Sequence, residues 1–176
     1  MWIHPFINIG CPTFDSSSKY LVPDDNGLPA LTQWWRGSIA GYIDFSRADA
    51  ADWWSSRVRQ LQSNYGIDSF KFDAGESNWL PSCYQLKNTP LEQQPNSYTE
   101  SCVRNMERFG PMVEVRTAWN SQDVPIFTRM LDKESVWGYQ NGLKTLVTSL
   151  LLFNIQGYPF ILPDMVIRSK MTHSKI

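Results

Sequence analysis

Charged side chains stand at the ends of several strand-like runs in this sequence, where parallel sheets usually place their chemistry. These residues are Asp73, Arg116, Asp132 and Asp164. Asp73 closes a run in which Phe70 and Phe72 alternate with polar residues, as the side chains of a strand do. Because the carboxyl ends of parallel strands meet at one edge of a sheet, we expect these four groups to converge.

Two carboxylates that face one cleft are the minimum set of groups for glycoside hydrolysis. In the retaining mechanism one carboxylate attacks the anomeric carbon and the other protonates the leaving oxygen, with the carboxyls about 5–5.5 Å apart. Asp73, at the end of a rigid strand, suits the nucleophile. Asp132, in the polar loop expected after the Arg116 strand, suits the acid/base. Arg116 is expected to hold the nucleophile ionised or to bind sugar hydroxyls.

Other side chains near these positions are further candidates. Lys71 lies one pleat below Asp73 and would stabilise its negative charge. Glu76 follows closely and would bind a sugar hydroxyl or cap a turn. The residues predicted to bind the substrate are therefore Trp35, Lys71, Glu76, Arg116 and Asp164. For each group taken separately, a turn cap or a surface ion pair is the better explanation, so the hypothesis depends on their convergence.

The aromatic residues have two interpretations. They make up 14% of the chain and include eight tryptophans. Trp53 and Trp54 fall in a predicted helix, where at least one should pack against the sheet. Trp34 and Trp35 precede a glycine in a long loop and are better placed to offer flat faces to a sugar.

The elements that must position these groups alternate between strand and helix. Predicted strands are 2–10, 67–73, 112–119 and 159–162, and predicted helices are 48–65, 98–109 and 140–153. Ser46 is the expected N-cap of the first helix and Gly66 its C-cap. The last helix is apolar nearly all round and should be buried. Residues 11–35, 74–96 and the stretch after 119 are predicted loops.

This order predicts an α/β fold with a parallel sheet. The loops after strands are long and those after helices are short, as in a (β/α)8 barrel whose βα loops build the active site. A full barrel takes about 250 residues, so 176 residues predict a partial TIM barrel of about half that architecture. A doubly wound, flavodoxin-like sheet is the alternative, although the sequence has no glycine-rich phosphate loop.

Composition excludes several classes of function. The net charge is −1, which offers no electrostatic attraction to nucleic acid. Three cysteines without a CxxC motif and two distant histidines predict no metal site. The apolar run 143–161 is interrupted by polar residues and Pro159, which favours a buried helix and strand over a transmembrane segment. A Schiff-base enzyme that uses Lys71 and a non-catalytic carbohydrate-binding fragment are the competing interpretations.

Four motifs follow one another along the chain. They are Gly41-Tyr42-Ile43-Asp44-Phe45 with Trp53-Trp54, Lys71-Phe72-Asp73-Ala74-Gly75-Glu76, Met130-Leu131-Asp132-Lys133 with Trp137, and Gly157 to Asp164. Together they resemble glycoside hydrolase family 31. Arg116 stands sixteen residues before Asp132, as the family's sugar-binding Arg stands before its acid/base. The chain departs from the family where it has KFDAGE, where Gly and Asn are missing around Asp132, and where Pro163 replaces Ala.

The resemblance implies a retaining, exo-acting α-glycosidase that needs no metal or organic cofactor and acts on an α-linked oligosaccharide or glycoside. One branch of the family carries the KFDAGE form, and likeness to it implies α-galactosidase-like specificity and a place in the endoplasmic reticulum lumen or nuclear envelope. The predicted catalytic domain covers 1–165. Residues 166–176 depart from the family as a basic polar tail, so we expect a truncated barrel without the family's membrane anchor. Such a chain would be catalytically impaired, or act at most as a carbohydrate-binding or regulatory fragment.

Overall fold

A five-stranded parallel sheet organises this chain. The computed structural model describes residues 1–35 and 37–164, so the predicted tail 166–176 lies outside the described residues. The strands, in their order across the sheet, are β1 (Trp2–Ile3), β5 (Lys71–Phe72), β6 (Glu114–Val115), β7 (Phe127–Arg129) and β8 (Ile161–Leu162). All four pairings are parallel.

The strand order across this sheet is also the order along the chain. Each new strand is added at the same edge, so the described strands contain none of the reversals that define a doubly wound sheet. This order is that of a segment of a (β/α)8 barrel. The flavodoxin-like alternative is therefore wrong. Backbone hydrogen bonds lengthen the short β1–β5 pairing, with Lys71 N donating to Met1 O and Asp73 N to Ile3 O, each at 2.8 Å.

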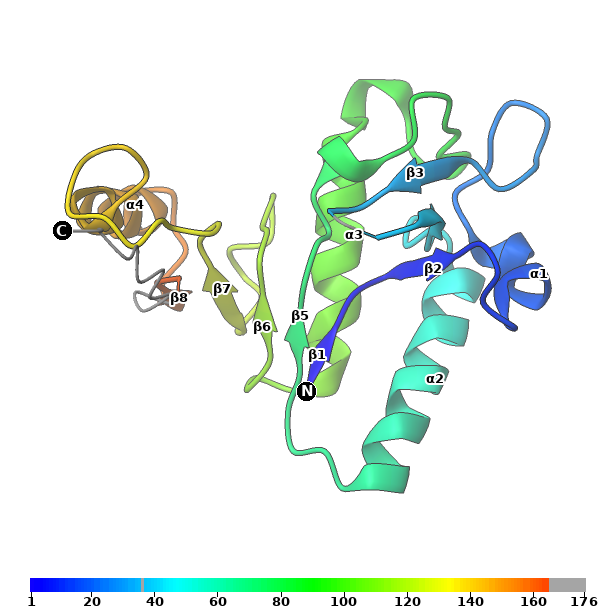
Figure 1. The fold of residues 1–176 in the computed structure, drawn as a ribbon, viewed down its shortest axis with the longest axis horizontal. Coiled ribbons are helices and arrows are strands. Elements are labelled where there is room, and N and C mark those ends of the chain that lie inside the picture. The colour runs from blue at the N-terminus through cyan, green and yellow to red at the C-terminus, as the bar shows by residue number, and fades with distance from the viewer. Residues whose placement is uncertain (36, 165–176) are drawn as a thin grey trace, which may run out of the picture.

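A second, antiparallel sheet interrupts the alternation of strand and helix (Figure 1). Its strands are β2 (Phe6–Asn8), β3 (Leu31–Gln33) and β4 (Ile39–Tyr42), in the order β2-β4-β3. The single strand predicted for 2–10 is therefore wrong. The run divides around Pro5, and its two parts pair in different sheets. Proline lacks the N–H that a continuous central strand would donate, which explains a break there.

The predicted loop 11–35 contains regular structure as well as turns. It holds the short helix α1 (Phe14–Ser17), a 3-10 turn at Ser18–Tyr20 and strand β3. Between the last two, the Asp24 carboxylate accepts hydrogen bonds from the Asn26 and Leu28 N–H groups at 2.8 and 3.0 Å. An aspartate that binds the backbone ahead of it reverses the chain locally, and this reversal returns the loop to the sheet.

Helix α2 (Ala48–Tyr65) has the predicted bounds. Ala50, Trp54 and Val58 are buried at helical spacing, and Gly66 ends the helix in the left-handed conformation at φ +61°. The predicted N-cap is wrong, because Arg47 occupies that position without a capping side-chain bond. Ser46 instead donates its hydroxyl to Asp44 Oδ1 at 2.5 Å.

The core lies between the parallel sheet and the helices α2 and α3 (Figure 1). Helix α3 (Asn96–Met106) begins two residues before the predicted start and continues as a 3-10 turn, Glu107–Phe109. The ring of Trp54 lies 5.6 Å from that of Phe72 and 5.3 Å from that of Phe45. Trp54 is therefore the core member of the Trp53-Trp54 pair. The preceding loop, 74–96, carries 3-10 turns at Ser77–Trp79 and Leu91–Gln93.

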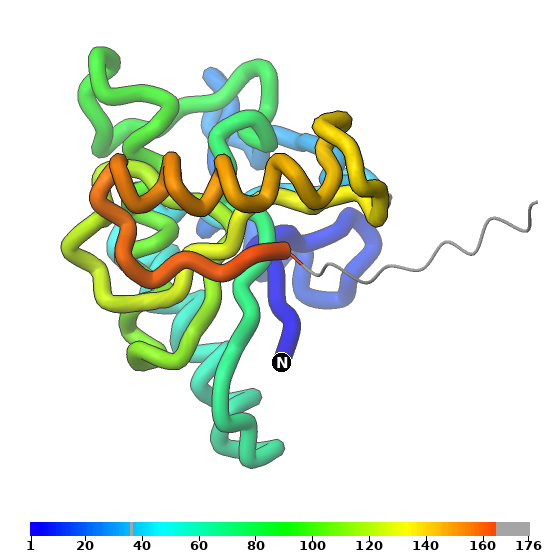
Figure 2. The backbone as a smooth tube through the Cα atoms, turned by 90° about the vertical axis from the view of Figure 1, so that its left-hand side faces the viewer, coloured from blue at the N-terminus to red at the C-terminus, as the bar shows by residue number. Residues whose placement is uncertain are grey.

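The last helix does not meet the expectation of burial. Helix α4 (Leu143–Ile155) follows β7 and packs against β8, but no residue within it is buried. Figure 2 looks at the end of the molecule where α4, in orange, lies in front of the other segments. Its uncovered apolar side chains include Val147, Leu151, Leu152 and Ile155. No helix in the described part of the chain is both long and apolar enough to cross a bilayer.

The predicted polar loop after residue 119 contains a central strand. Residues 127–129 form β7, between β6 and β8. Its three residues are too few to produce a clear period-two pattern, so charged neighbours obscure it in the sequence. Asp132 therefore follows β7, not β6.

Tyr42 links the two sheets, and its hydroxyl provides a test of this link. The fully buried Tyr42 hydroxyl accepts a hydrogen bond from Gly75 N, just after β5, at 2.8 Å. Tyr42→Phe should lower the free energy of unfolding by about 1–3 kcal/mol, because it leaves a buried N–H without a partner. Urea denaturation would measure the loss. Tyr65→Phe, at an exposed tyrosine, is the matched control and should cost little; equal losses would contradict the role of the link.

Candidate active site

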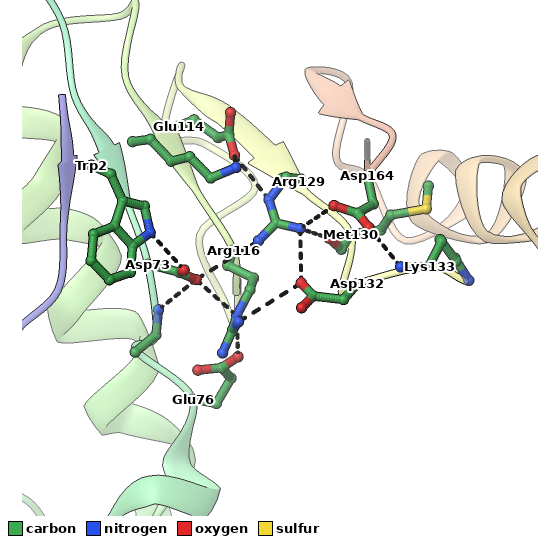
Figure 3. Close-up of polar contacts among 12 residues, drawn as sticks. Trp2, Asp73, Glu76, Glu114, Arg116, Arg129, Met130, Asp132, Lys133 and Asp164 are labelled. Carbon is green, nitrogen blue, oxygen red and sulfur yellow. Dashed lines mark hydrogen bonds and ion pairs between the residues drawn. The ribbon is translucent and has the colours of Figure 1, made fainter. Parts of the chain in front are cut away.

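Asp73 is held at the carboxyl end of β5 by contacts on two sides. Its backbone N–H donates to Ile3 O in the neighbouring strand, and the Trp2 indole Nε1 donates to its Oδ2 at 2.8 Å (Figure 3). Its side chain is 11% exposed. The sequence did not reveal Trp2 as a member of this site, although it stands at the start of a strand that proves adjacent. Asp73 thus has little freedom to move.

The chain turns sharply immediately after Asp73, as predicted. Ala74 has φ +63° and Gly75 has φ +99°, two successive residues in the positive-φ region. A non-glycine residue there costs conformational energy that the surrounding structure must offset. The surroundings are tight, since Gly75 N donates to Tyr42 and Gly75 O accepts from the Thr99 hydroxyl at 2.9 Å. This turn brings Glu76 back toward the carboxyl edge of the sheet.

Arg116, which follows β6, lies among three carboxylates. Its Nε lies 3.1 Å from Asp73 Oδ1 and 2.7 Å from Glu76 Oε1, and its Nη1 lies 3.9 Å from Asp132 Oδ1. Burial alone would lower the pKa of the guanidinium, but the hydrogen bond and charge of Glu76, with the charges of Asp73 and Asp132, raise that pKa above its usual value. Arg116 is therefore a permanent cation beside Asp73.

Arg129, on β7, is a member of the site that sequence reasoning missed. Its side chain is 5% exposed. It ion-pairs with carboxylates from four parts of the chain: Asp73 at 3.7 Å, Glu114 at 2.9 Å, Asp132 at 3.3 Å and Asp164 at 2.8 Å. The apolar residues Ile126 and Phe127 before it were the available signal for a buried strand here. The residue was overlooked because its strand was interpreted as a loop.

Asp132 lies on the loop after β7 with a side chain that is 77% exposed. Its Oδ1 contacts the same two guanidinium groups, of Arg116 and Arg129, that contact Asp73 Oδ1. The Asn141 side-chain amide donates to its backbone carbonyl at 2.9 Å. The structure thus brings the two predicted carboxylates together around shared cations (Figure 3). The carboxylate of Asp73 is largely shielded from solvent and that of Asp132 is open to it.

Lys71 has a different partner from the one expected. Its Nζ lies 3.4 Å from Glu114 Oε1, on the neighbouring strand β6, where the parallel register places the two residues opposite each other. Among the residues that the structure describes, the cations within ion-pair distance of Asp73 are Arg116 and Arg129. We expected Lys71 to stabilise the charge of Asp73 directly. The structure places these two arginines, and not Lys71, beside that carboxylate.

Asp164 and Glu76 differ in the number of their carboxylate oxygens that have a protein partner. Both carboxylate oxygens of Asp164 have protein partners, with Oδ1 2.8 Å from Arg129 Nη1 and Oδ2 accepting from Lys133 N at 2.6 Å. Glu76 Oε1 is bound by Arg116, while its buried Oε2 accepts no hydrogen bond from the described residues. Glu76 thus retains an acceptor.

An aromatic hollow of about 230 Å³ opens beside Trp2, the residue whose indole donates to Asp73. It is lined mainly by Trp2, His4, Phe6, Trp34 and Trp35. Trp34 is buried and stacks on Phe6 at 5.4 Å, so it is largely a core residue, whereas Trp35 is 64% exposed. Burial lowers the pKa of His4, although the charge of Asp73 opposes this shift.

Residues 1–165 match the family model described as Glycosyl hydrolases family 31 TIM-barrel domain. The myogenesis-regulating glycosidase of Mus musculus is 38% identical over 169 residues, which cover 94% of this chain and 23% of that protein. The alpha-xylosidase XylQ of Lactiplantibacillus pentosus is 29% identical over 103 residues, covering 56% of this chain and 13% of that protein.

Solved structures share the fold. The cycloalternan-degrading enzyme from Trueperella pyogenes, in complex with cycloalternan, superposes with a TM-score of 0.80 at 18% identity, over 96% of this chain and 25% of that one. The predicted α/β class and the partial TIM barrel are confirmed. The chain spans a quarter or less of the length of each of these three proteins.

The turn after Asp73 should be sensitive to a single added methyl group. At Gly75, a Cβ would lie 2.9 Å from Thr117 Cγ2 and 3.1 Å from Cys102 Sγ, whereas at Gly66, which also has positive φ, it would meet nothing within 4 Å. Both Gly→Ala variants incur backbone strain, but Gly75→Ala adds crowding. We expect it to lose about 1 kcal/mol or more of unfolding free energy beyond Gly66→Ala in urea denaturation. Equal losses would contradict this prediction, because they would show that Thr117 and Cys102 move aside to accommodate the added methyl group.

Proposed function

This chain belongs to glycosyl hydrolase family 31, and we propose that it carries the catalytic site of a retaining, exo-acting α-glycosidase with α-galactosidase-like specificity. The observation that carries the proposal is the pairing of Asp73 and Asp132 around the guanidinium groups of Arg116 and Arg129. Two carboxylates that share cations must lie close together, as the retaining mechanism requires.

In the first step, a carboxylate oxygen of Asp73 attacks the anomeric carbon of an α-glycoside. The bond from that carbon to the leaving oxygen breaks, and the carboxylic acid of Asp132 gives its proton to that oxygen. In the second step, Asp132 as carboxylate takes a proton from water. The water oxygen bonds to the anomeric carbon, and the ester bond to Asp73 breaks. Two inversions leave the product with the configuration of the substrate.

The contrasting environments of the two carboxylates support these roles. Asp73 is held by Trp2 and Arg116 at the end of a strand, and a nucleophile gains most from a fixed position and a retained negative charge. Asp132 is open to solvent, from which the water of the second step must come. Its exposure also leaves room for the group that departs.

The substrate part of the proposal rests on resemblance and on the aromatic hollow. The exposed ring of Trp35 offers an apolar face of the kind that packs on a sugar, and the buried Glu76 Oε2 offers an acceptor for a hydroxyl. Lys71 and Arg116 are the remaining sugar-binding candidates. The α-galactosidase-like specificity, and a place in the endoplasmic reticulum lumen or nuclear envelope, follow from likeness to the KFDAGE-bearing branch of the family.

A second function is sugar binding without turnover. It is favoured by the aromatic hollow and the exposed ring of Trp35, which offer a sugar an apolar face without involving either carboxylate. Calorimetric titration of the 176-residue chain with an α-galactoside distinguishes the two. Binding that survives Asp73→Asn and Asp132→Asn, with no hydrolysis by the parent chain, would favour the binding function.

Asp73 should become covalently labelled by a fluorinated α-galactosyl fluoride, which forms the glycosyl-enzyme readily and releases it slowly. Mass spectrometry of peptides should locate the adduct on Asp73, and Asp73→Asn should abolish it, because an amide is not a nucleophile here. Asp123→Asn, at an exposed carboxylate bound by Arg104, is the matched control and should label normally. An adduct on another residue would remove Asp73 from the proposed role.

Replacing the acid/base should affect substrates according to their leaving group. Asp132→Ala should slow hydrolysis of an α-galactoside with a poor leaving group by about 10²–10⁴-fold, while a galactosyl fluoride, which needs no proton, still forms the intermediate. Added azide should then release an α-galactosyl azide, because an anionic nucleophile needs no general base. Equal losses on both substrates, without an azide product, would contradict the assignment of Asp132.

A further inference from the structure

As the acid/base, Asp132 must be held in a fixed position, because general acid catalysis needs a carboxyl group within hydrogen-bond reach of the leaving oxygen. The residue lies on a loop beyond the end of β7, and its own side chain is mostly exposed. Loop residues are more mobile than the elements that they connect, so other groups must hold the backbone and the carboxylate of Asp132 in place.

Arg129 supplies the first contact. Its Nη1 lies 3.3 Å from Asp132 Oδ1, 2.8 Å from Asp164 Oδ1 and 2.9 Å from the carbonyl oxygen of Met130. The arginine thus binds the carboxylate of Asp132 and also the backbone two residues before it. Because Arg129 is buried on a central strand, its guanidinium is a fixed point from which the loop can be held.

Asp164 supplies the second contact, from the end of β8. Its Oδ1 is bound by Arg129, and its Oδ2 accepts from the backbone N–H of Lys133, the residue after Asp132. Arg129 and Asp164 therefore bind the backbone on both sides of Asp132, at the Met130 carbonyl and at the Lys133 amide (Figure 3). Both oxygens of Asp164 are occupied by this arrangement, and the residue is buried.

We propose that Arg129 and Asp164 form a clamp that positions Asp132 as the acid/base. The inference deepens the proposed function and rests on it. It makes Asp164 a positioning residue in place of the sugar-binding residue that the sequence suggested. Neither member needs to touch the substrate. Charge-assisted hydrogen bonds suit this task, since they are shorter and stronger than neutral ones.

The loop continues from the clamp onto α4. Lys133 Nζ lies 3.0 Å from the Thr145 hydroxyl and 3.3 Å from the Ser149 hydroxyl. The two hydroxyl groups that Lys133 contacts are uncharged, and they lie on a helix with no buried residue. The clamp members, by contrast, are buried ions. We therefore assign to the clamp, and not to α4, the main role in fixing Asp132.

A first experiment needs no turnover and uses the full chain. Hydrogen exchange is followed at the Lys133 amide in the parent, in Asp164→Asn and in the matched surface control Asp123→Asn. Asparagine offers one acceptor oxygen, so it can keep only one of the two clamp contacts. Asp164→Asn should speed exchange at Lys133 by about tenfold or more, with the amide of Asp73 unchanged. Exchange at Lys133 that matches the control would overturn the clamp.

Arg129→Lys is the second variant, in case Asp164→Asn does not fold. Lysine keeps the positive charge but cannot bind Asp132, Asp164 and the Met130 carbonyl together through one planar fork. It should also speed exchange at Lys133. Arg104→Lys, at an arginine on α3 that ion-pairs with Glu100 and Asp123, is its control. Slow exchange at Lys133 in Arg129→Lys would overturn the clamp.

A second experiment separates positioning of the acid/base from a merely structural role. Asp164→Asn should slow hydrolysis of an α-galactoside with a poor leaving group by about tenfold or more, while formation of the intermediate from galactosyl fluoride changes little. Equal losses on both substrates would overturn the positioning role even if exchange at Lys133 rises. A parent chain inactive on both substrates would contradict the proposed function, and the exchange measurement would still decide whether the clamp exists.

Discussion

The ion pairs of Arg116 and Arg129 are the interaction on which the carboxyl edge of this sheet depends. Two guanidinium groups, together with Lys71, stand among five carboxylates: Asp73, Glu76, Glu114, Asp132 and Asp164. Most of these groups are shielded from water, so each would be costly to bury alone. Within the described part of the chain, removing Arg116 would leave Glu76 without a cationic partner, and removing Arg129 would leave Asp164 without one. Either loss is far more damaging than the loss of one surface pair, because the remaining charge is shielded from water.

These ions also explain how strands of only two or three residues hold functional groups in place. Backbone pairing over so short a distance restrains a strand end weakly. Arg129, on β7, contacts side chains from β6, from the end of β5 and from the end of β8. The charged network therefore crosses the sheet perpendicular to the strands and ties four of its five strands together at the edge where chemistry takes place.

The two halves of the site rest on different supports. Asp73 lies above a dense aromatic core, in which Trp54, Phe72 and Phe109 contact one another, and its turn is bound by Tyr42 and Thr99. The loop that carries Asp132 leads to α4, whose apolar side chains are mostly uncovered. Few buried contacts imply low local stability. The acid/base side thus depends on ion pairs where the nucleophile side depends on packing.

Local chemistry in the sequence determined several features outright. The helical spacing of the apolar residues along the 18-residue helix α2 and its terminal glycine set that helix, and Asp73-Ala74-Gly75 set the sharp turn after β5. Other features depended on the tertiary structure: the partner of Lys71, the role of Trp2, the strand β7 and the buried Arg129. Each of these features depends on contacts between residues that are far apart in the sequence, such as Trp2 with Asp73 and Arg129 with Asp164. Only the register of the parallel strands brings such residues together, and strands this short leave no periodicity from which that register could be predicted.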